Sequence, residues 1–81
     1  MAYGVKKYYQ AMNKSEIIKR LKADNKGDSF LTLRDIRSSL GIGHNTACDL
    51  LAETDWLLIG KTRRYLVDDV ADAILEKRRR P

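Results

Sequence analysis

The chain has few of the residues on which most protein chemistry depends. Its single cysteine, Cys48, excludes a disulfide framework, and we expect a reducing, intracellular compartment. Its single histidine, His44, has no serine or cysteine partner in a recognisable nucleophile motif, and the chain contains no glycine-rich loop of the kind that cradles phosphate. We therefore expect a protein that is not an enzyme.

Metal ligands and membrane-spanning segments are scarce as well. His44 and Cys48 stand at the spacing i, i+4, at which two side chains can share a metal, but a structural zinc needs four ligands and the chain has no other cysteine or histidine. No apolar run approaches the length of a membrane span, and the first residues lack the apolar stretch of a signal peptide. The expectation is a soluble, cytoplasmic protein without metal or cofactor.

The basic residues are unevenly distributed along the chain. The 81 residues, 43% of them hydrophobic, fit one domain with a small core, and the formal net charge of +5 favours a polyanionic partner. Residues 41–60 contain three acids and neither lysine nor arginine, and residues 65–76 contain four acids. The positive charge is therefore concentrated in the first 40 residues, in residues 61–64 and in the tail, residues 77–80.

The middle of the chain has the pattern of two short helices joined by a glycine turn. Thr32 and Asp35 resemble a capping box and mark the start of the first helix. Gly41 can adopt the left-handed conformation that closes a helix, and Gly43 then caps a second helix from His44 to about Glu53. The inward positions have helical spacing: Leu33, Ile36, Leu40, Ala47, Leu50 and Leu51. Two short helices joined in this way are typical of a helix-turn-helix.

A β-hairpin and a closing helix are expected after the second helix. The runs Trp56–Ile59 and Tyr65–Val67 are rich in β-branched and aromatic residues, and they flank the polar loop Gly60–Arg64. Asp68 or Asp69 is expected to cap the closing helix, which ends in the cationic tail. The sequence thus predicts a mainly α domain with a small β-hairpin, in the order of a winged helix-turn-helix.

The N-terminal part is less regular. Asn13 and Glu16 have capping-box spacing and predict a helix that runs to about Ala23, and residues 30–31 are expected to form a short strand. The first residues are either a flexible arm or a short strand around Val5 to Tyr9. The predicted division of the chain is an N-terminal arm, 1–12, a winged helix-turn-helix domain with an extra N-terminal helix, 13–77, and a basic tail, 78–81.

Trp56 is expected at the centre of the core that fixes the second helix and the hairpin relative to each other. Cys48 is expected to be a free, partly buried thiol. The other predicted core residues are Phe30, Leu33, Ile36, Leu50, Leu57, Val70 and Ile74.

Over about residues 31–77 the chain resembles the excisionase-type branch of the MerR-like winged helix-turn-helix domains. The resemblance rests on Leu31–Ile36, Leu40–Gly43, Thr46, Leu50–Leu51, Gly60, Arg63–Tyr65 and the closing amphipathic helix. It implies a small DNA-binding protein of a phage or mobile element, either a recombination directionality factor or a transcriptional regulator. It also implies contacts from the C-terminal residues to an integrase or to a second copy of the chain.

The predicted base contacts lie in the first turn of the second helix, where helix-turn-helix proteins reach base edges in the major groove. Asn45 can bond the N6 and N7 atoms of adenine together, His44 can donate to a guanine acceptor or to a phosphate, and Thr46 can touch a thymine methyl group. Thr46 has the alternative role of supporting the helix cap.

Apart from Thr62, whose hydroxyl can donate to a phosphate, the predicted backbone contacts are cationic. On the hairpin they are Lys61, Thr62, Arg63 and Arg64, placed against phosphates or in the minor groove, and on the first motif helix they are Arg34 and Arg37. Arg37 has an alternative role as the ion-pair partner of Asp49 or Glu53.

Two other functions stay open at this point. The acids Asp49, Glu53 and Asp55 favour a protein-interaction module, in which the second helix docks on a recombinase or polymerase subunit. Binding of single-stranded or structured RNA would use tyrosines as stacking surfaces. These tyrosines are Tyr3, Tyr8, Tyr9 and Tyr65. For the basic tail, two ligands stay open: the DNA backbone and an acidic partner.

Overall fold

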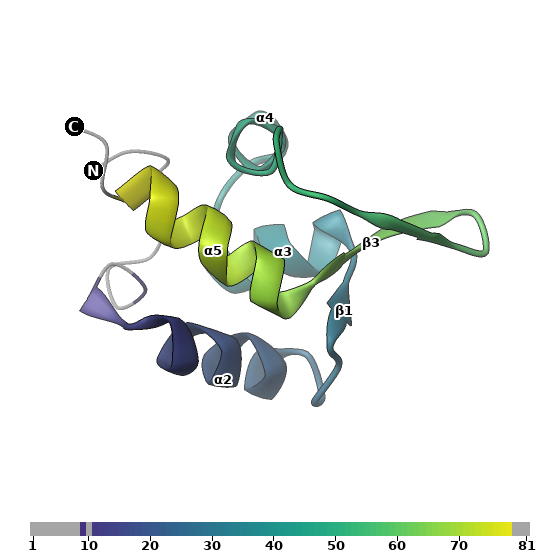
Figure 1. Ribbon diagram of the computed structural model, residues 1–81. Helices are drawn as coiled ribbons and strands as arrows, with labels where there is room; N and C mark the ends of the chain where they lie inside the picture. The colour runs from purple at the N-terminus through teal and green to yellow at the C-terminus, as the bar shows by residue number, and fades with distance from the viewer. Residues whose placement is uncertain (1–8, 10, 79–81) are drawn as a thin grey trace.

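The computed structural model describes residue 9 and residues 11–78. In chain order the elements are α2 (Lys14–Asp24), β1 (Phe30–Leu31), α3 (Leu33–Leu40), α4 (His44–Leu50), β2 (Leu57–Ile59), β3 (Thr62–Leu66) and α5 (Val67–Arg78) (Figure 1). The described part is mainly helical with a small antiparallel sheet, which confirms the predicted fold class. The order of the elements is compatible with a winged helix-turn-helix. Over the described residues, none of the helices has the length and apolar character that crossing a bilayer requires.

Both predicted capping boxes are present. At the start of α2, the Asn13 side chain accepts from the backbone N–H of Glu16 (2.9 Å), and the Glu16 carboxylate accepts from the backbone N–H of Asn13 (3.0 Å). At the start of α3, Thr32 and Asp35 make the same two bonds, each 3.2 Å long. These bonds satisfy backbone donors that have no partner within the helix, so the helix starts are fixed by local sequence.

Gly41 closes α3 as predicted. Its φ of 71° is left-handed, and its N–H donates to the carbonyl of Arg37 (2.9 Å). Gly43 is the N-cap of α4 and supplies no side-chain hydrogen bond. The helix α4 ends at Leu50 rather than near Glu53, because the backbone passes into a tighter turn in which the N–H of Thr54 donates to the carbonyl of Leu51 (3.0 Å).

The three strands form one antiparallel sheet in the order β1-β3-β2. Ile59 pairs with Thr62, so the hairpin loop contains only residues 60 and 61. The predicted loop Gly60–Arg64 is therefore too long: Thr62, Arg63 and Arg64 belong to β3. The predicted second strand is also displaced, because Val67 already begins α5 and Asp68 and Asp69 lie in its first turn rather than at its cap.

The core lies between α2, α3, α4 and α5 and reaches the hairpin only at its base. Its fully buried large side chains are Tyr9, Ile17, Leu21, Leu31, Ile36, Leu40, Leu50, Val67 and Val70. Of the predicted core, Ile36, Leu50, Val70 and Ile74 are buried, and Phe30 and Leu33 are partly buried. Trp56 and Leu57 are 45% and 52% exposed, so their placement in the core was wrong. The reason is visible in Figure 1: the hairpin extends beyond the helices, and its distal part has no helix to pack against.

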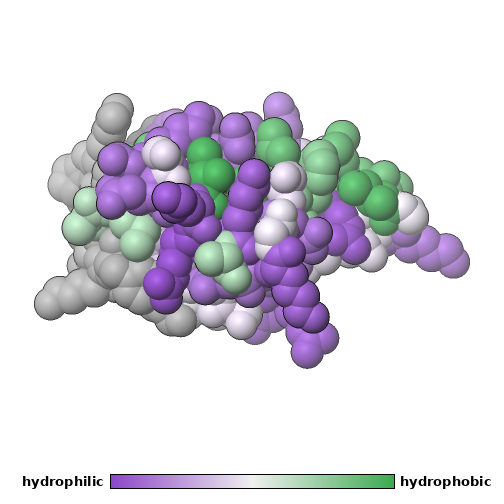
Figure 2. Space-filling model, turned by 90° about the horizontal axis from the view of Figure 1, so that it is seen from below, coloured by the Kyte–Doolittle hydropathy of each residue, from purple (hydrophilic) through white to green (hydrophobic). Residues whose placement is uncertain are grey.

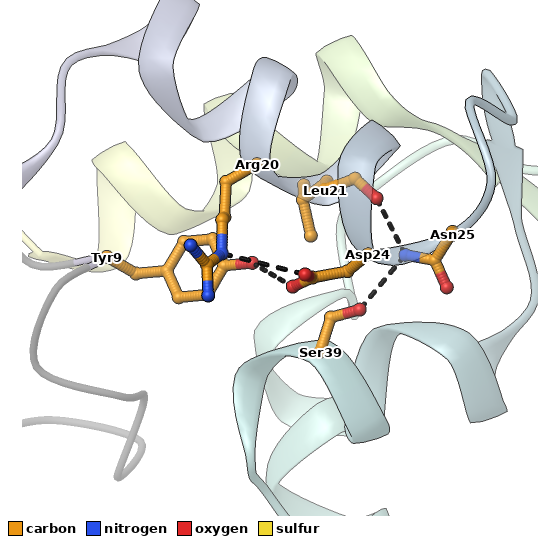
Figure 3. A network of polar contacts seen from close by, with 6 residues as sticks. All are labelled: Tyr9, Arg20, Leu21, Asp24, Asn25 and Ser39. Atoms are coloured by element: carbon orange, nitrogen blue, oxygen red, sulfur yellow. Dashed lines mark hydrogen bonds and ion pairs between the residues drawn. The ribbon is translucent and has the colours of Figure 1, made fainter.

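Tyr9 lies in this core although it precedes the first predicted helix. Its ring is fully buried, and its hydroxyl donates to the carboxylate of Asp24 at the end of α2 (3.2 Å), as Figure 3 shows. The second oxygen of that carboxylate lies 3.6 Å from Nε of Arg20. The position was assigned to an N-terminal arm, but Tyr9 packs in the helical core.

A second set of hydrogen bonds joins the end of α2 to α3. The side-chain amide of Asn25 donates both to the carbonyl of Leu21 (2.8 Å) and to the hydroxyl of Ser39 (2.9 Å) (Figure 3). These bonds give the buried Ser39 a partner, as a polar group removed from water requires. They fix α2 against the first helix of the helix-turn-helix.

An exposed ion pair joins α2 to α5. Nζ of Lys14 lies 2.9 Å from Oδ1 of Asp72, and this hydrogen bond raises the pKa of Lys14 above its ordinary value of 10.5. A raised pKa favours the folded state below pH 10.5, and the effect is lost as the pH rises through the pKa of the folded protein. Because both side chains are well exposed, solvent screening keeps the contribution small.

Replacing Tyr9 tests whether the N-terminal segment is part of the folded unit. We expect Tyr9→Ala to lower the free energy of unfolding by about 3–5 kcal/mol, because it removes a buried aromatic ring. Tyr9→Phe keeps the ring and loses one hydrogen bond, so we expect a loss of about 0.5–1.5 kcal/mol. Urea unfolding followed by circular dichroism measures both, and an alanine variant as stable as the wild type would contradict the packing of Tyr9.

Candidate nucleic-acid interface

The first turn of α4 presents the three predicted base-contacting residues at the surface. His44 and Asn45 are exposed and Thr46 is half-buried. The helix has this orientation because Ala47 and Leu50, on its other face, are buried in the core. The structure therefore brings His44, Asn45 and Thr46 together on one exposed helical turn.

Cys48 lies one turn further along α4 and is exposed, so the expectation of a partly buried thiol was wrong. It sits on the outer face because the neighbouring Ala47 takes the inward position. Its sulfur is 3.5 Å from Nε2 of His44, the contact that the i, i+4 spacing predicts. Among the described residues, no three His, Cys, Asp or Glu side chains are grouped as a metal site requires.

The hairpin cations are divided between the two faces of β3. Side chains alternate along a strand, so Arg63 and Arg64 point to opposite sides. Lys61, Thr62 and Arg63 are exposed, whereas Arg64 is partly buried. The predicted cluster of four polar residues is thus not one patch at a loop tip: Lys61 lies in the turn, and the other three lie along the strand.

Arg63 stacks on an aromatic ring. Its guanidinium carbon lies 4.2 Å from the centre of the Trp56 ring, within the range of a cation–π interaction. A guanidinium that lies flat on a ring keeps its in-plane N–H groups free to bond anions. Trp56, which was predicted for the core, instead supports a cation at the surface.

Arg64 lies along the opposite face of the sheet. It lines a shallow apolar groove together with Phe30, Trp56, Leu57 and Leu66. Its Nε is buried and has no hydrogen-bond partner in the described part of the chain. The stem of Arg64 therefore covers apolar surface, which restricts where its guanidinium can reach.

The two arginines of α3 differ in exposure. Arg34 is exposed, and Arg37 is partly buried with an Nε that lacks a hydrogen-bond partner among the described residues. The alternative pairing of Arg37 with Asp49 or Glu53 does not occur within residues 11–78. Arg34 lines a groove at the end of α2 together with the acids Asp24, Asp28 and Asp35, and not with residues of α4 or the hairpin.

An acidic groove lies between the end of α4 and α5, and it was missed in the sequence. It is lined by five acids, Glu53, Asp55, Asp69, Asp72 and Glu76, together with Lys77. The signal was present as negative charge in two separate segments, 41–60 and 65–76, but only the packing of α5 beside α4 joins them. A polyanion is repelled from this side of the molecule.

Two tyrosines expected for RNA stacking are unsuitable. Tyr9 and Tyr65 are buried, so neither ring is presented to a base. Tyr3 and Tyr8 lie outside the described residues, as do the side chain of Arg78 and residues 79–81 of the basic tail.

The candidate interface consists of α4 and the hairpin. Figure 1 shows α4 and the projecting hairpin on the side of the molecule away from α2. Comparison of the chain with protein-family models, with curated proteins and with solved structures gave no match. The resemblance to excisionase-type domains therefore stays a prediction from sequence, and a function has to be argued from the surface itself.

Proposed function

We propose that the protein binds duplex DNA, with α4 in the major groove and the β2–β3 hairpin against the adjacent backbone or minor groove. The observation that carries this proposal is the combination of an exposed polar first turn on α4 with a projecting cationic hairpin that follows it in the chain. Helix-turn-helix proteins use such a turn to reach base edges, and an arginine-bearing extension to follow the backbone.

In this binding mode, recognition of the DNA sequence depends on the polar residues of α4. Asn45 is exposed and would form the paired hydrogen bonds to adenine, with His44 beside it as a donor to guanine or to a phosphate. Thr46 is half-buried, which suits either a methyl contact or support of the helix start. No cation lies on α4, so these contacts supply selectivity rather than charge neutralisation.

Affinity in this mode depends on the hairpin. The Arg63 guanidinium lies over the Trp56 ring, and this contact restricts the side chain before it binds, which lowers the entropy cost of bonding a phosphate. Lys61 in the turn adds exposed positive charge. Because so few cations face the duplex, we expect modest affinity that falls with rising salt.

The biological role that we propose is that of an excisionase-like recombination directionality factor or a transcriptional regulator of a phage or mobile element. Its support is the sequence resemblance over residues 31–77. The two roles differ in their readout: a directionality factor changes the yield of integrase-catalysed excision at attachment-site DNA, whereas a regulator changes transcription from a promoter that carries its site.

A second candidate is a protein-interaction module, and the acidic groove between α4 and α5 favours it. Five carboxylates on one groove suit a basic segment of a partner such as a recombinase or polymerase subunit. This function predicts that charge reversal at Glu53 and Asp72 abolishes partner binding and does not weaken DNA binding.

Removing the hairpin arginines should weaken binding to every duplex. For Arg63→Ala combined with Arg64→Ala, we expect lower affinity for specific and random DNA alike, since phosphate contacts carry no sequence information. The slope of log Kd against log salt should fall by about 1 for each phosphate that the variant no longer neutralises. Fluorescence anisotropy over a series of salt concentrations measures both quantities.

The matched control for this variant is Lys19→Ala combined with Lys22→Ala. It removes the same charge from α2, on the side of the molecule away from α4. A control that loses as much affinity and slope as the hairpin variant would show that only net charge matters, and would argue against a hairpin contact.

Asn45→Ala should instead reduce selectivity. We expect a loss of about 1–3 kcal/mol on the preferred sequence, recovered by selection from a random duplex pool, and little change on random DNA. Ser15→Ala, at an exposed position of α2, is the control. Equal losses on all sequences would show that Asn45 does not read bases.

A further inference from the structure

The strand β2 is an unprotected edge. It lies at the end of the sheet order β1-β3-β2, so one side of its backbone pairs with β3 and the other faces solvent. Its three residues are apolar and exposed: Leu57 by 52%, Leu58 by 63% and Ile59 by 46%. Figure 2 shows apolar surface gathered towards the hairpin end of the molecule. Edge strands of monomeric proteins are usually blunted by charges, proline or a covering element, and β2 itself has none of these.

The hairpin geometry determines which backbone groups face solvent. Ile59 and Thr62 flank a two-residue loop in which Gly60 has a φ of 65°, as in a type II′ turn. The pair beside such a loop is bonded within the hairpin, and bonded and unbonded positions then alternate along the strand. Leu57 and Ile59 therefore direct their N–H and C=O groups to β3. Leu58 directs its own to the free edge.

A second copy of the same strand fits this edge in one antiparallel register. With a two-fold axis at Leu58, each Leu58 faces its own copy and exchanges two backbone hydrogen bonds with it. Leu57 then faces Ile59, so apolar side chains meet on both faces of the joined sheet. Residues 56 and 60, the other positions whose groups point to the free edge, also face each other.

The charges that flank β2 complement each other in the same register. Asp55 precedes β2 by two residues and Lys61 lies in the turn that follows it, so this antiparallel register brings each Asp55 close to the turn that carries the Lys61 of the other copy. Opposite charges at facing positions stabilise an antiparallel pair, and like charges destabilise it. Moving the axis to Leu57 puts Asp55 opposite Ile59. Moving it to Ile59 puts Asp55 opposite Arg63, which lies on the inner strand of the hairpin.

We propose that two copies of this chain associate through β2, forming one continuous six-stranded antiparallel sheet with a two-fold axis at Leu58. The exposed apolar strand and the unpaired backbone groups allow β2 to accept an added strand, and the self-complementary charges of Asp55 and Lys61 favour a second copy over a foreign strand. The dimer forms without DNA, and it leaves α4 and both hairpin arginines outside the new strand pairing. Its test is therefore separate from that of DNA binding.

Sedimentation equilibrium of the full chain without DNA tests the dimer directly. We expect a reversible, concentration-dependent dimer of the wild type and a monomer for Leu58→Lys, which places two cations at the axis. Leu58 is 63% exposed, so the substitution should leave the fold intact, and circular dichroism checks this. A wild type that stays monomeric up to about 1 mM, or that forms larger open assemblies, overturns the proposal.

A charge-exchange pair tests the register. Asp55→Lys and Lys61→Asp each place like charges opposite one another at both ends, so we expect each variant alone to dimerise about tenfold more weakly or worse. An equimolar mixture of the two restores opposite charges at both ends and should dimerise like the wild type. Lys19→Asp, on α2, is the charge-matched control and should change nothing. Single variants that dimerise like the wild type, or a mixture that stays as weak as its components, overturn the proposed register.

Discussion

The pairing of β1 with β3 is the interaction on which the rest of the structure depends. Only two residue pairs form it, Phe30 with Leu66 and Leu31 with Tyr65. Yet Thr32, the cap of α3, directly follows β1, and α5 begins directly after β3. With no linker at either point, this short ladder fixes the start of the helix-turn-helix, the start of α5 and the base of the hairpin. The buried Leu31–Tyr65 pair anchors the hairpin to the core, and beyond it the strands project without support.

The fold also separates the charges of a chain that is basic overall. Positive side chains lie on the projecting hairpin and on α3, whereas α5 beside the end of α4 forms an acidic groove. A duplex that approaches α4 is therefore attracted on the hairpin side and repelled on the α5 side. This asymmetry restricts the orientation in which the duplex can bind, and it adds little to the affinity. The same separation gives β2 an acid before it and a lysine after it, the arrangement on which the proposed pairing of two copies depends.

Features set by neighbouring residues could be predicted from the sequence, and features set by packing could not. The capping boxes and the left-handed Gly41 were predicted because each depends on side chains within a few residues. Trp56 was misplaced because hydrophobicity does not reveal whether a helix covers the strand, and Cys48 because the face of a short helix is decided by its neighbours. Tyr9 was missed because the sequence around it shows no periodicity and because its hydrogen-bond partner, Asp24, lies 15 residues further along the chain. The residues predicted to contact bases lie together on one exposed turn, as their sequence positions imply, whereas the alternation of Arg63 and Arg64 required the strand register.

The central claim is that the first turn of α4 and the hairpin face the same DNA ligand. Amide chemical-shift mapping of the isotope-labelled chain, titrated with a short duplex at low salt, tests it most directly. We expect shifts at His44–Thr46 and at Lys61–Arg64, with α2 unaffected, and a gradual return of these shifts as salt is added. No shifts at low salt, or shifts confined to the acidic groove between α4 and α5, would contradict it.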